Sequence, residues 1–326
     1  MSRVVSGSSV TVAYDEPFTS LNAIAGDTPI EANSELAEAV LAGFTSVDSN
    51  GTHTPDRSFG TVTVVSRDPL TVRYRVADGV RWSDGVPVDA VDLLLDWAAG
   101  SGLFPAFDAP RAAPGLALAT GMPTISDDRK SLTVVYGADL SDYETQLDGA
   151  LPAHVAAREA LGVGDPEAAK DAVIDAVEHA VQGDATRLGE IASWWNGGFS
   201  LDAGRDVLVS DAPYRIDSVV LGKSVTLVSN AKYVGAHKPT YATVRLVTLD
   251  AASALQGIEA GEVQIASLDA TAPTRAVVAK TDPVLFDAGD DAKRIVAMAR
   301  AAVSGVQPTP DGTGLLRNVW QWTPTR

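Results

Sequence analysis

The stretch that decides the fold is Tyr74–Asp92, which reads YRVADGVRWSDGVPVDAVD. Its first residues alternate apolar and polar side chains as a strand does, and Asp78-Gly79 then forms a turn. Trp82 follows, and Ser83-Asp84-Gly85 makes a second tight turn. Asp89 stands where a helix N-cap belongs, because apolar residues recur behind it at helical spacing. The stretch therefore predicts a strand, two turns and a capped helix in direct succession.

Structural roles explain this motif without a ligand. Large aromatic side chains chiefly supply buried area, so we expect Trp82 to pack in a core rather than to stack on a ligand. Gly79 and Gly85 are expected to serve turns that need a positive φ. The motif thus identifies a fold and assigns no contact with a substrate.

The composition excludes several classes of function. The chain has 326 residues, enough for two domains with a sizeable core, and its formal net charge is −17. Such acidity argues against nucleic acid as a partner and against an electrostatic hold on anionic lipid, because both need a basic face. Without cysteine the chain has no disulfide, no thiolate catalysis, no zinc-thiolate site and no iron–sulfur cluster.

The N-terminus, MSRVVSGSSV, lacks the charged-then-apolar pattern of an export signal. The sequence therefore predicts either a cytoplasmic chain or one supplied without its signal segment. No run of about twenty apolar residues occurs, so no membrane span is expected.

Strands and helices alternate along much of the chain. Runs of period-two or continuous apolar residues predict strands at Ser9–Tyr14, Thr61–Val65, Leu70–Val76, Ser131–Tyr136, Ser224–Ser229, Tyr241–Thr248 and Glu262–Ser267. Helical spacing predicts helices that begin near Thr28, Asp89, Leu151, Asp165, Asp184 and Asp250, and a last helix at Asp290–Val303. The order strand, helix, strand over residues 241–267 predicts a parallel unit.

Several segments follow the Trp82 stretch in a fixed order: LPAH at Leu151–His154, SDAPYRI at Ser210–Ile216, a strand and YVGAHKP within Val225–Pro239, GIEAGEVQI at Gly257–Ile265 and NVWQW at Asn318–Trp322. Together they resemble the family 5 solute-binding proteins of ABC importers, the peptide- and nickel-binding group, and its actinobacterial members in particular. The resemblance covers residues from about 8 to 270 and from about 305 to 322. Asp211 stands where the family usually has glycine, and Val234 where tryptophan is common.

The resemblance implies an α/β fold, a periplasmic-binding-protein-like (class II) lobe with a mixed sheet and a smaller β-rich domain. We expect the lobe to be discontinuous, formed by residues 1–48 and 205–326. The smaller domain is expected at residues 49–204, between the two parts of the lobe.

The second lobe of the family has no counterpart of sufficient length. In the family it lies between the strand matched by Gly257–Ile265 and the C-terminal return, and it supplies the acidic residue that takes a peptide's N-terminus. Here only Leu268–Asp290 lies between, which is too short for a lobe with its own core. We expect most of the second lobe to be absent. A deletion near Leu285–Asp291 is the favoured reason, and a naturally half-sized relative is the alternative.

No pattern of a known catalytic or metal site occurs. The four histidines include no pair at the spacing of helical metal ligands. The nucleophile elbow, the P-loop and the dinucleotide fingerprint are missing. Acidic pairs fall in turns or caps, where solvation explains them. We therefore predict no enzyme, no cofactor and no metal site.

The loop before the first helix is one candidate for ligand contact. In the family this loop offers backbone groups to an extended ligand, and it corresponds to Ala25, Gly26, Asp27 and Thr28. Free N–H groups at a helix N-terminus also suit a carboxylate or a carbonyl. Simple capping of the helix by Thr28 explains the loop equally well.

Trp194, Trp195 and Asn196 form the second candidate. Adjacent residues on a helix point about 100° apart, so at most one of the two indoles readily joins the core beneath. The other is left for a cleft or an interface. Packing is the favoured role, and ligand contact stays open.

The resemblance implies an extracytoplasmic solute-binding component of an ABC importer, with oligopeptide as its solute. The full-length precursor would be tethered by lipid and would deliver solute to an ABC permease. In the shortened form we expect weak binding and a homodimer over the exposed cleft face, or a loop that covers it. A binding-incompetent interaction or oligomerisation module is the alternative, and an enzyme with an unrecognised site is a third class.

Overall fold

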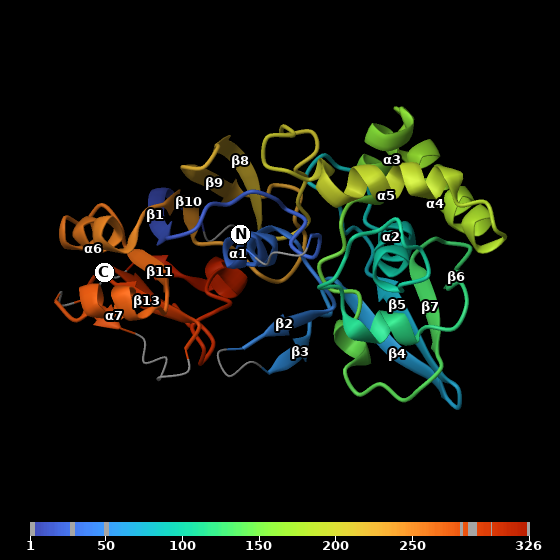
Figure 1. Ribbon diagram of the computed structural model, residues 1–326, viewed down its shortest axis with the longest axis horizontal. Coiled ribbons are helices and arrows are strands. Elements are labelled where there is room, and N and C mark those ends of the chain that lie inside the picture. Colours follow the sequence, from blue (N-terminus) through green and yellow to red (C-terminus); the bar gives the residue numbers. More distant parts are fainter. Residues whose placement is uncertain are drawn as a thin grey trace.

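The structure is a computed structural model that describes residues 4–26, 30–48, 52–280, 283–285, 292–300 and 302–324. A seven-stranded mixed sheet runs through it in the order β12-β13-β11-β1-β10-β9-β8 (Figure 1). Its strands are β1 (Val5–Tyr14), β8 (Tyr214–Val220), β9 (Ser224–Ser229), β10 (Tyr241–Thr248), β11 (Ile265–Asp269), β12 (Val284–Leu285) and β13 (Arg294–Met298).

Strand β1 is the centre of this sheet. It pairs in parallel with β10 on one side and β11 on the other, and the remaining pairs are antiparallel. Its C-terminal half, Val10 and Val12–Tyr14, is fully buried, as expected where both faces of a parallel strand are covered.

The predicted strand–helix–strand unit is confirmed, with β1 inserted between its strands. Helix α6 (Ala251–Glu259) connects β10 to β11, and both strands run parallel to β1. The helix begins at Asp250, whose Oδ1 accepts the backbone N–H of Ser253 at 3.0 Å. Helix α7 (Ala272–Val278) follows β11 and packs beside α6.

Strand β13 lies next to β11 in antiparallel register, with Asp269 opposite Arg294. This position contradicts the helix predicted at Asp290–Val303, because residues 294–298 form a strand. Arg294–Ala297 are all buried in the sheet. A short continuous apolar run is typical of a buried strand as much as of a helix, and its period does not separate the two.

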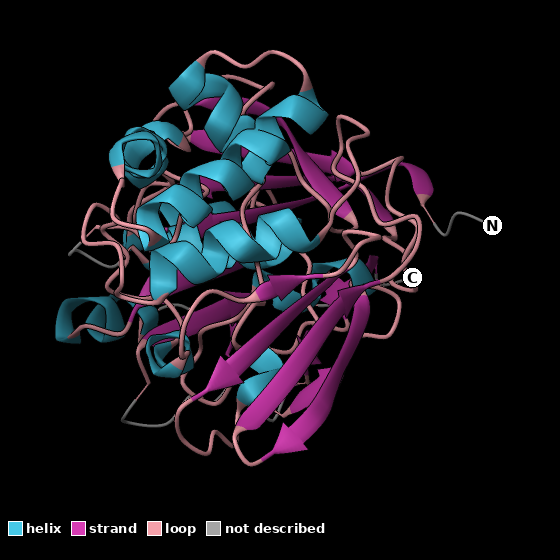
Figure 2. Ribbon diagram, turned by 90° about the vertical axis from the view of Figure 1, so that its right-hand side faces the viewer, coloured by secondary structure: helices cyan, strands magenta, loops and turns pink. Residues whose placement is uncertain are grey.

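A second, antiparallel sheet has the order β4-β5-β7-β6. Its strands are β4 (Gly60–Arg67), β5 (Leu70–Val76), β6 (Thr124–Ile125) and β7 (Ser131–Tyr136). The helices around it are α2 (Ala90–Gly100), α3 (Ala153–Leu161), α4 (Pro166–Val181) and α5 (Thr186–Gly198). Figure 2 shows helices stacked above the strands of this smaller sheet. The segment expected to be β-rich thus combines its sheet with a helical layer, and the domain boundaries at 48/49 and 204/205 stay a prediction.

The Tyr74–Asp92 stretch folds as its sequence predicts. Gly79 and Gly85 occupy the two turns at φ 84° and 103°. Asp89 caps α2 by accepting the N–H of Val91 at 2.9 Å, and Asp92 accepts the N–H of Asp89 in return at 3.0 Å. The Trp82 side chain is fully buried, which confirms its packing role.

Short elements connect the two sheets. Helix α1 (Glu31–Val40) packs on β8, and after it comes the hairpin β2 (Thr45–Val47) and β3 (His53–Pro55). The predicted cap Thr28 lies outside the described residues, and α1 begins after Ile30 without a side-chain cap. The remaining elements are the 3₁₀ turns η1 (Pro114–Leu118), η2 (Tyr143–Thr145) and η3 (Leu316–Gln321) and the pair β14 (Val303–Ser304) and β15 (Thr323–Pro324).

Candidate functional site

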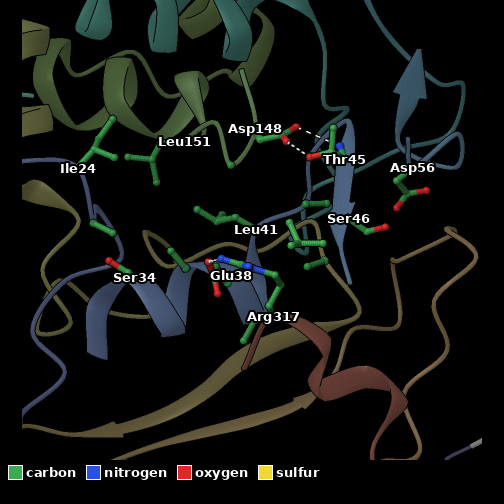
Figure 3. Close-up of a pocket in the computed structure, with 18 of the residues that line it drawn as sticks. Ile24, Ser34, Glu38, Leu41, Thr45, Ser46, Asp56, Asp148, Leu151 and Arg317 are labelled. Atoms are coloured by element: carbon green, nitrogen blue, oxygen red, sulfur yellow. Dashed lines mark hydrogen bonds and ion pairs between the residues drawn. The ribbon is translucent and has the colours of Figure 1, made fainter. Parts of the chain in front are cut away.

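A cavity of about 400 Å³ lies between helix α1, with the hairpin after it, and two segments that follow α2 in the chain. One wall is formed by α1, the β2–β3 hairpin, residues 212–214 at the start of β8 and residues 317–320 of η3. The opposite wall is formed by residues 111–116 and 146–151, with Asp96 from α2 (Figure 3). Its size falls within the range of small-molecule sites, and its wall is predominantly apolar.

Helix α1 contributes two faces to this site. Leu36 and Val40 are fully buried against the sheet, while Ser34, Glu38 and Leu41 line the cavity. Figure 3 shows the Glu38 carboxylate meeting the Arg317 guanidinium from η3. This ion pair forms part of the cavity wall.

Asp148 fixes the start of the hairpin. Its Oδ1 accepts the N–H groups of Phe44 at 2.5 Å and Thr45 at 3.2 Å, and its Oδ2 accepts the Thr45 hydroxyl. A Cβ at Gly43 would lie 2.5 Å from the same Oδ1, so the close approach needs glycine there. Burial raises the pKa of Asp148 to about 7, although these hydrogen bonds act to lower it.

Asp96 lines the cavity from the last two turns of α2, and 9% of its surface is exposed. Within the described ranges no hydrogen bond or ion pair reaches its carboxylate. Burial, and then the charge of Asp148, raise the pKa of Asp96 to about 7. The contrast with Asp92 is clear, because Asp92 is paired with the Lys170 ammonium at 3.0 Å.

Gln146 is the second buried group without a full set of partners. It is 2% exposed, and its Nε2 donates to the backbone carbonyl of Asp142 at 3.0 Å. That bond fixes the amide orientation, and among the described atoms its Oε1 has no donor. Buried polar atoms in proteins normally have partners, so unpaired acceptors in a cavity wall indicate a place for a donor.

The predicted loop at Ala25 and Gly26 is described, whereas Asp27 and Thr28 lie outside the described residues. The Arg111 guanidinium holds this loop by donating to the carbonyls of Ala23 at 3.0 Å, Ala25 at 2.5 Å and Gly26 at 2.6 Å. The carbonyls of Ala25 and Gly26 are therefore already bonded. Ala23 and Ile24 border the cavity, but Ala25 and Gly26 are not among its lining residues.

The predicted tryptophans pack within the protein. Trp195 is 1% exposed and meets the Phe107 ring edge-on at 5.4 Å. Trp194 is half-buried and meets the Phe199 ring at 4.9 Å. Neither indole lines the cavity.

Asn196 connects the two predicted segments. Its Oδ1 accepts the N–H of Asp108 and its Nδ2 donates to the carbonyl of Ala106, both at 2.9 Å. The carbonyl of Asp108 in turn accepts the N–H of Gly26 at 3.2 Å. Asn196, residues 106–111 and the Gly26 loop thus form one hydrogen-bonded unit at the rim of the cavity. Ligand contact by any of these residues remains a prediction.

Among the described residues no group of three or more His, Cys, Asp or Glu side chains is arranged to hold a metal ion. None of the helices in the described ranges combines the length and the apolar character that a membrane crossing needs.

No protein-family model matches the chain. Curated relatives include an uncharacterized lipoprotein of Mycobacterium leprae (strain TN), 35% identical over 211 residues, and one of Mycobacterium tuberculosis (strain ATCC 25618 / H37Rv), 31% identical over 220 residues. These matches cover 63% and 64% of this chain but 35% and 37% of the relatives. The chain thus spans about a third of the length of these relatives.

Solved structures that share this fold include solute-binding proteins. A periplasmic EDTA-binding protein, EppA, gives a TM-score of 0.66 at 22% identity, covering 84% of this chain and 46% of that one. The oligopeptide-binding protein AppA of Bacillus subtilis, in complex with a nonapeptide, gives 0.58 at 16% identity, covering 82% and 45%. NikZ of Campylobacter jejuni, in complex with Ni(L-His), gives 0.55 at 14% identity, covering 85% and 46%. The chain spans about half of each of these structures.

Proposed function

We propose, from the fold that this chain shares with the family 5 solute-binding proteins, that it is the solute-binding component of an ABC importer in a shortened form. Its proposed solute is an oligopeptide. Its proposed place is outside the cytoplasmic membrane, where the full-length precursor is held by lipid and hands its solute to a permease. Capture rather than catalysis is proposed because the neighbours of known structure are binding proteins.

The observation that carries this proposal is the cavity beside helix α1. Its wall is mainly apolar, yet it contains the Asp96 carboxylate and the Gln146 amide oxygen, both without partners among the described residues. An apolar hollow with a few convergent polar groups is the usual form of a small-molecule site.

The shortened form is proposed to be one lobe of the two that such proteins use. Two observations support it: the chain aligns with 46% of EppA, and residues 270–293 separate the neighbouring strands β11 and β13. A single lobe leaves one side of a bound solute in water. A homodimer that covers this side is part of the proposal, and sedimentation velocity tests it.

Isothermal titration calorimetry of the 326-residue chain with a library of short peptides tests the proposed capture. A variant that fills the cavity, Ala37→Phe, should lose the binding measured for the unmodified chain, because Ala37 lines the cavity. Ala168→Phe is the matched control, since Ala168 is exposed on α4 and does not line the cavity. Saturable binding that Ala37→Phe removes supports capture. No binding up to about 10 mM would overturn it in favour of an interaction module.

A further inference from the structure

The titratable side chains that line the cavity are not all paired with one another. Its basic side chains are Arg111, Arg317, His53 and His237, and its acidic ones are Glu38, Asp56, Asp96 and Asp148. This set matters because a charge left uncompensated inside a cavity favours a ligand of opposite charge.

The first two basic groups already have partners in the protein. The Arg111 guanidinium bonds three backbone carbonyls of the loop at residues 23–26. Arg317 pairs with Glu38. The charge of Arg317 is therefore neutralised by Glu38, and three of the five N–H donors of Arg111 are already used by the loop.

The two histidines also lie close to other side chains of the protein. His237 Nε2 lies 3.1 Å from Asp56 Oδ2, and its ring lies against Trp320 at 4.1 Å between centroids. His53 Nδ1 lies 3.0 Å from the Thr45 hydroxyl. Once these pairs are counted, the acidic groups without a cationic partner in the described part of the chain are Asp96 and Asp148.

Within the described part of the chain no cationic side chain forms an ion pair with either of these two carboxylates. Asp148 accepts hydrogen bonds from neutral donors only, namely the Phe44 and Thr45 N–H groups and the Thr45 hydroxyl. Asp96 accepts none within the described residues. The repulsion between the two raises the pKa of Asp96 further. Both carboxylates would be stabilised by a cation between them.

Two further oxygen atoms of the cavity lining are also hydrogen-bond acceptors without a donor. Gln146 Oε1 and the second oxygen of Glu38, Oε2, are buried acceptors that receive no hydrogen bond from any described group. An ammonium or guanidinium group carries several donors and no acceptor, so it matches such a wall, whereas a carboxylate or phosphate does not.

We propose that this cavity is a subsite for an organic cation, in which Asp96 pairs with an ammonium or guanidinium group of the solute and Gln146 Oε1 accepts a further hydrogen bond. The inference rests on the proposed capture function and names the chemical class of its ligand. The cationic group comes either from an arginine or lysine side chain of a peptide or from the free N-terminus. The two sources share their chemistry and differ in the probe that reveals them.

Four capped or uncapped tripeptides, titrated by calorimetry into the intact chain, separate these possibilities. Acetyl-Gly-Arg-Gly-amide carries only a guanidinium, and acetyl-Gly-citrulline-Gly-amide is its neutral isostere. Gly-citrulline-Gly-amide carries only the N-terminal ammonium. Gly-Arg-Gly-amide carries both groups. The probe that carries the recognised cationic group should bind about 10- to 100-fold more tightly than the neutral isostere. This factor is the usual contribution of a charge-assisted hydrogen bond.

The variant Asp96→Asn keeps the side-chain shape and removes the charge. It should abolish the preference for the charged probe while the melting temperature stays the same or rises, because a buried unpaired carboxylate is lost. Asp127→Asn is the matched control, since Asp127 is exposed in a turn and does not line the cavity. It changes the net charge equally and should leave the preference intact.

Proton release gives a second readout that does not depend on this variant. With the pKa of both Asp96 and Asp148 near 7, a bound cation should displace protons at neutral pH. Titration in buffers of different ionisation enthalpy measures this release. If the unmodified chain releases protons on binding and Asp96→Asn releases fewer, the assignment is supported. Binding without proton release contradicts it.

The outcomes separate the inference from the function on which it rests. If the neutral isostere binds as tightly as the charged probes, or if Asp96→Asn keeps the preference, the cation subsite is wrong and solute capture stands. If none of the four probes binds and no peptide of the library binds either, both the proposed subsite and the proposed capture are wrong.

Discussion

The carboxylate of Glu35 in α1 accepts the backbone N–H of Leu316 at 2.7 Å, although the two residues lie 281 positions apart in the chain. Its other oxygen accepts the N–H of Leu315 at 2.9 Å. Glu35 is fully buried, so a side chain near the N-terminus caps the 3₁₀ turn η3 near the C-terminus. This cap holds Arg317 and Trp320, two residues of the cavity wall, against α1.

Loss of this cap should weaken the fold. Glu35→Ala leaves two buried N–H groups without acceptors, and we expect it to lower the free energy of unfolding by about 2–4 kcal/mol. Glu35→Gln retains one acceptor oxygen and should cost less. Urea unfolding followed by tryptophan fluorescence measures both. Equal losses for Ala and Gln would show that the hydrogen bonds to η3 are not the cause.

The protein should be more stable in weak acid than in weak base. Burial raises the pKa of Glu35 and Asp211 to about 8 and that of Asp96 and Asp148 to about 7. The folded state therefore retains protons that the unfolded state has released. The free energy of unfolding should fall as pH rises from about 4.5 to about 8 and then level off.

Melting temperatures across this range measure the slope. The variant Asp96→Asn should make it shallower, because one of the four raised groups is gone. Asp127→Asn, at an exposed turn, should leave it unchanged. A melting temperature that rises steadily with pH over this range would contradict the raised pKa values.

Trp82 should be one of the most costly side chains to remove. It is fully buried, and its Nε1 donates to Asp92 at 3.4 Å. Trp82→Ala should lose about 3–5 kcal/mol through the cavity that it leaves. Trp194→Ala should lose less, since Trp194 is only half-buried. Unchanged melting of Trp82→Ala together with lost ligand binding would reverse the packing assignment.

Arg111 should control the order of the loop at residues 23–26. Its planar guanidinium reaches three carbonyls at once, and the single ammonium of lysine cannot reproduce that fork. Arg111→Lys should therefore speed amide exchange at Gly26, as measured by hydrogen–deuterium exchange. Arg187→Lys, at an exposed position on α5, provides the control. Unchanged exchange at Gly26 would show that its bond to Asp108 is sufficient.

Short peptides should bind weakly to this chain. A tight small-ligand site encloses most of its ligand, and one wall leaves a face wet. We expect di- to pentapeptides to bind no tighter than about the millimolar range, roughly −4 kcal/mol. Calorimetry on the intact chain gives the value. Micromolar binding would mean that the cavity, or a dimer, encloses the peptide without a second lobe.

Strands bounded by strong turn signals could be predicted to the residue. β5, β7, β9 and β10 have the limits that their sequence indicates, because turn residues close each run of apolar side chains. β13 could not be distinguished, since its five residues satisfy both the helical and the extended pattern.

The cavity could not be predicted from the sequence. Asp96 and Asp148 lie 52 positions apart, and only tertiary packing brings their charges together. One signal was available: Asp96 interrupts the apolar run Leu93–Ala99, where an ion has no local reason to be. Asp92, one turn earlier, also stands next to this apolar run, and Lys170 neutralises it. The signal alone therefore does not distinguish a structural ion pair from a ligand contact.

The pairing of Asp269 with Arg294 makes the connection between β11 and β13 a suitable site for the insertion of additional sequence. The chain leaves β11 at Asp269 and enters β13 at Arg294, which lies directly opposite, so the segment between them starts and ends at the same place. The length of this segment therefore has little effect on the packing of the rest of the molecule. Domain insertions are tolerated for the same reason, because their two ends lie close together. We expect segments of different length to be accepted there while Arg294 keeps its bonds to Asp15 and Ser267.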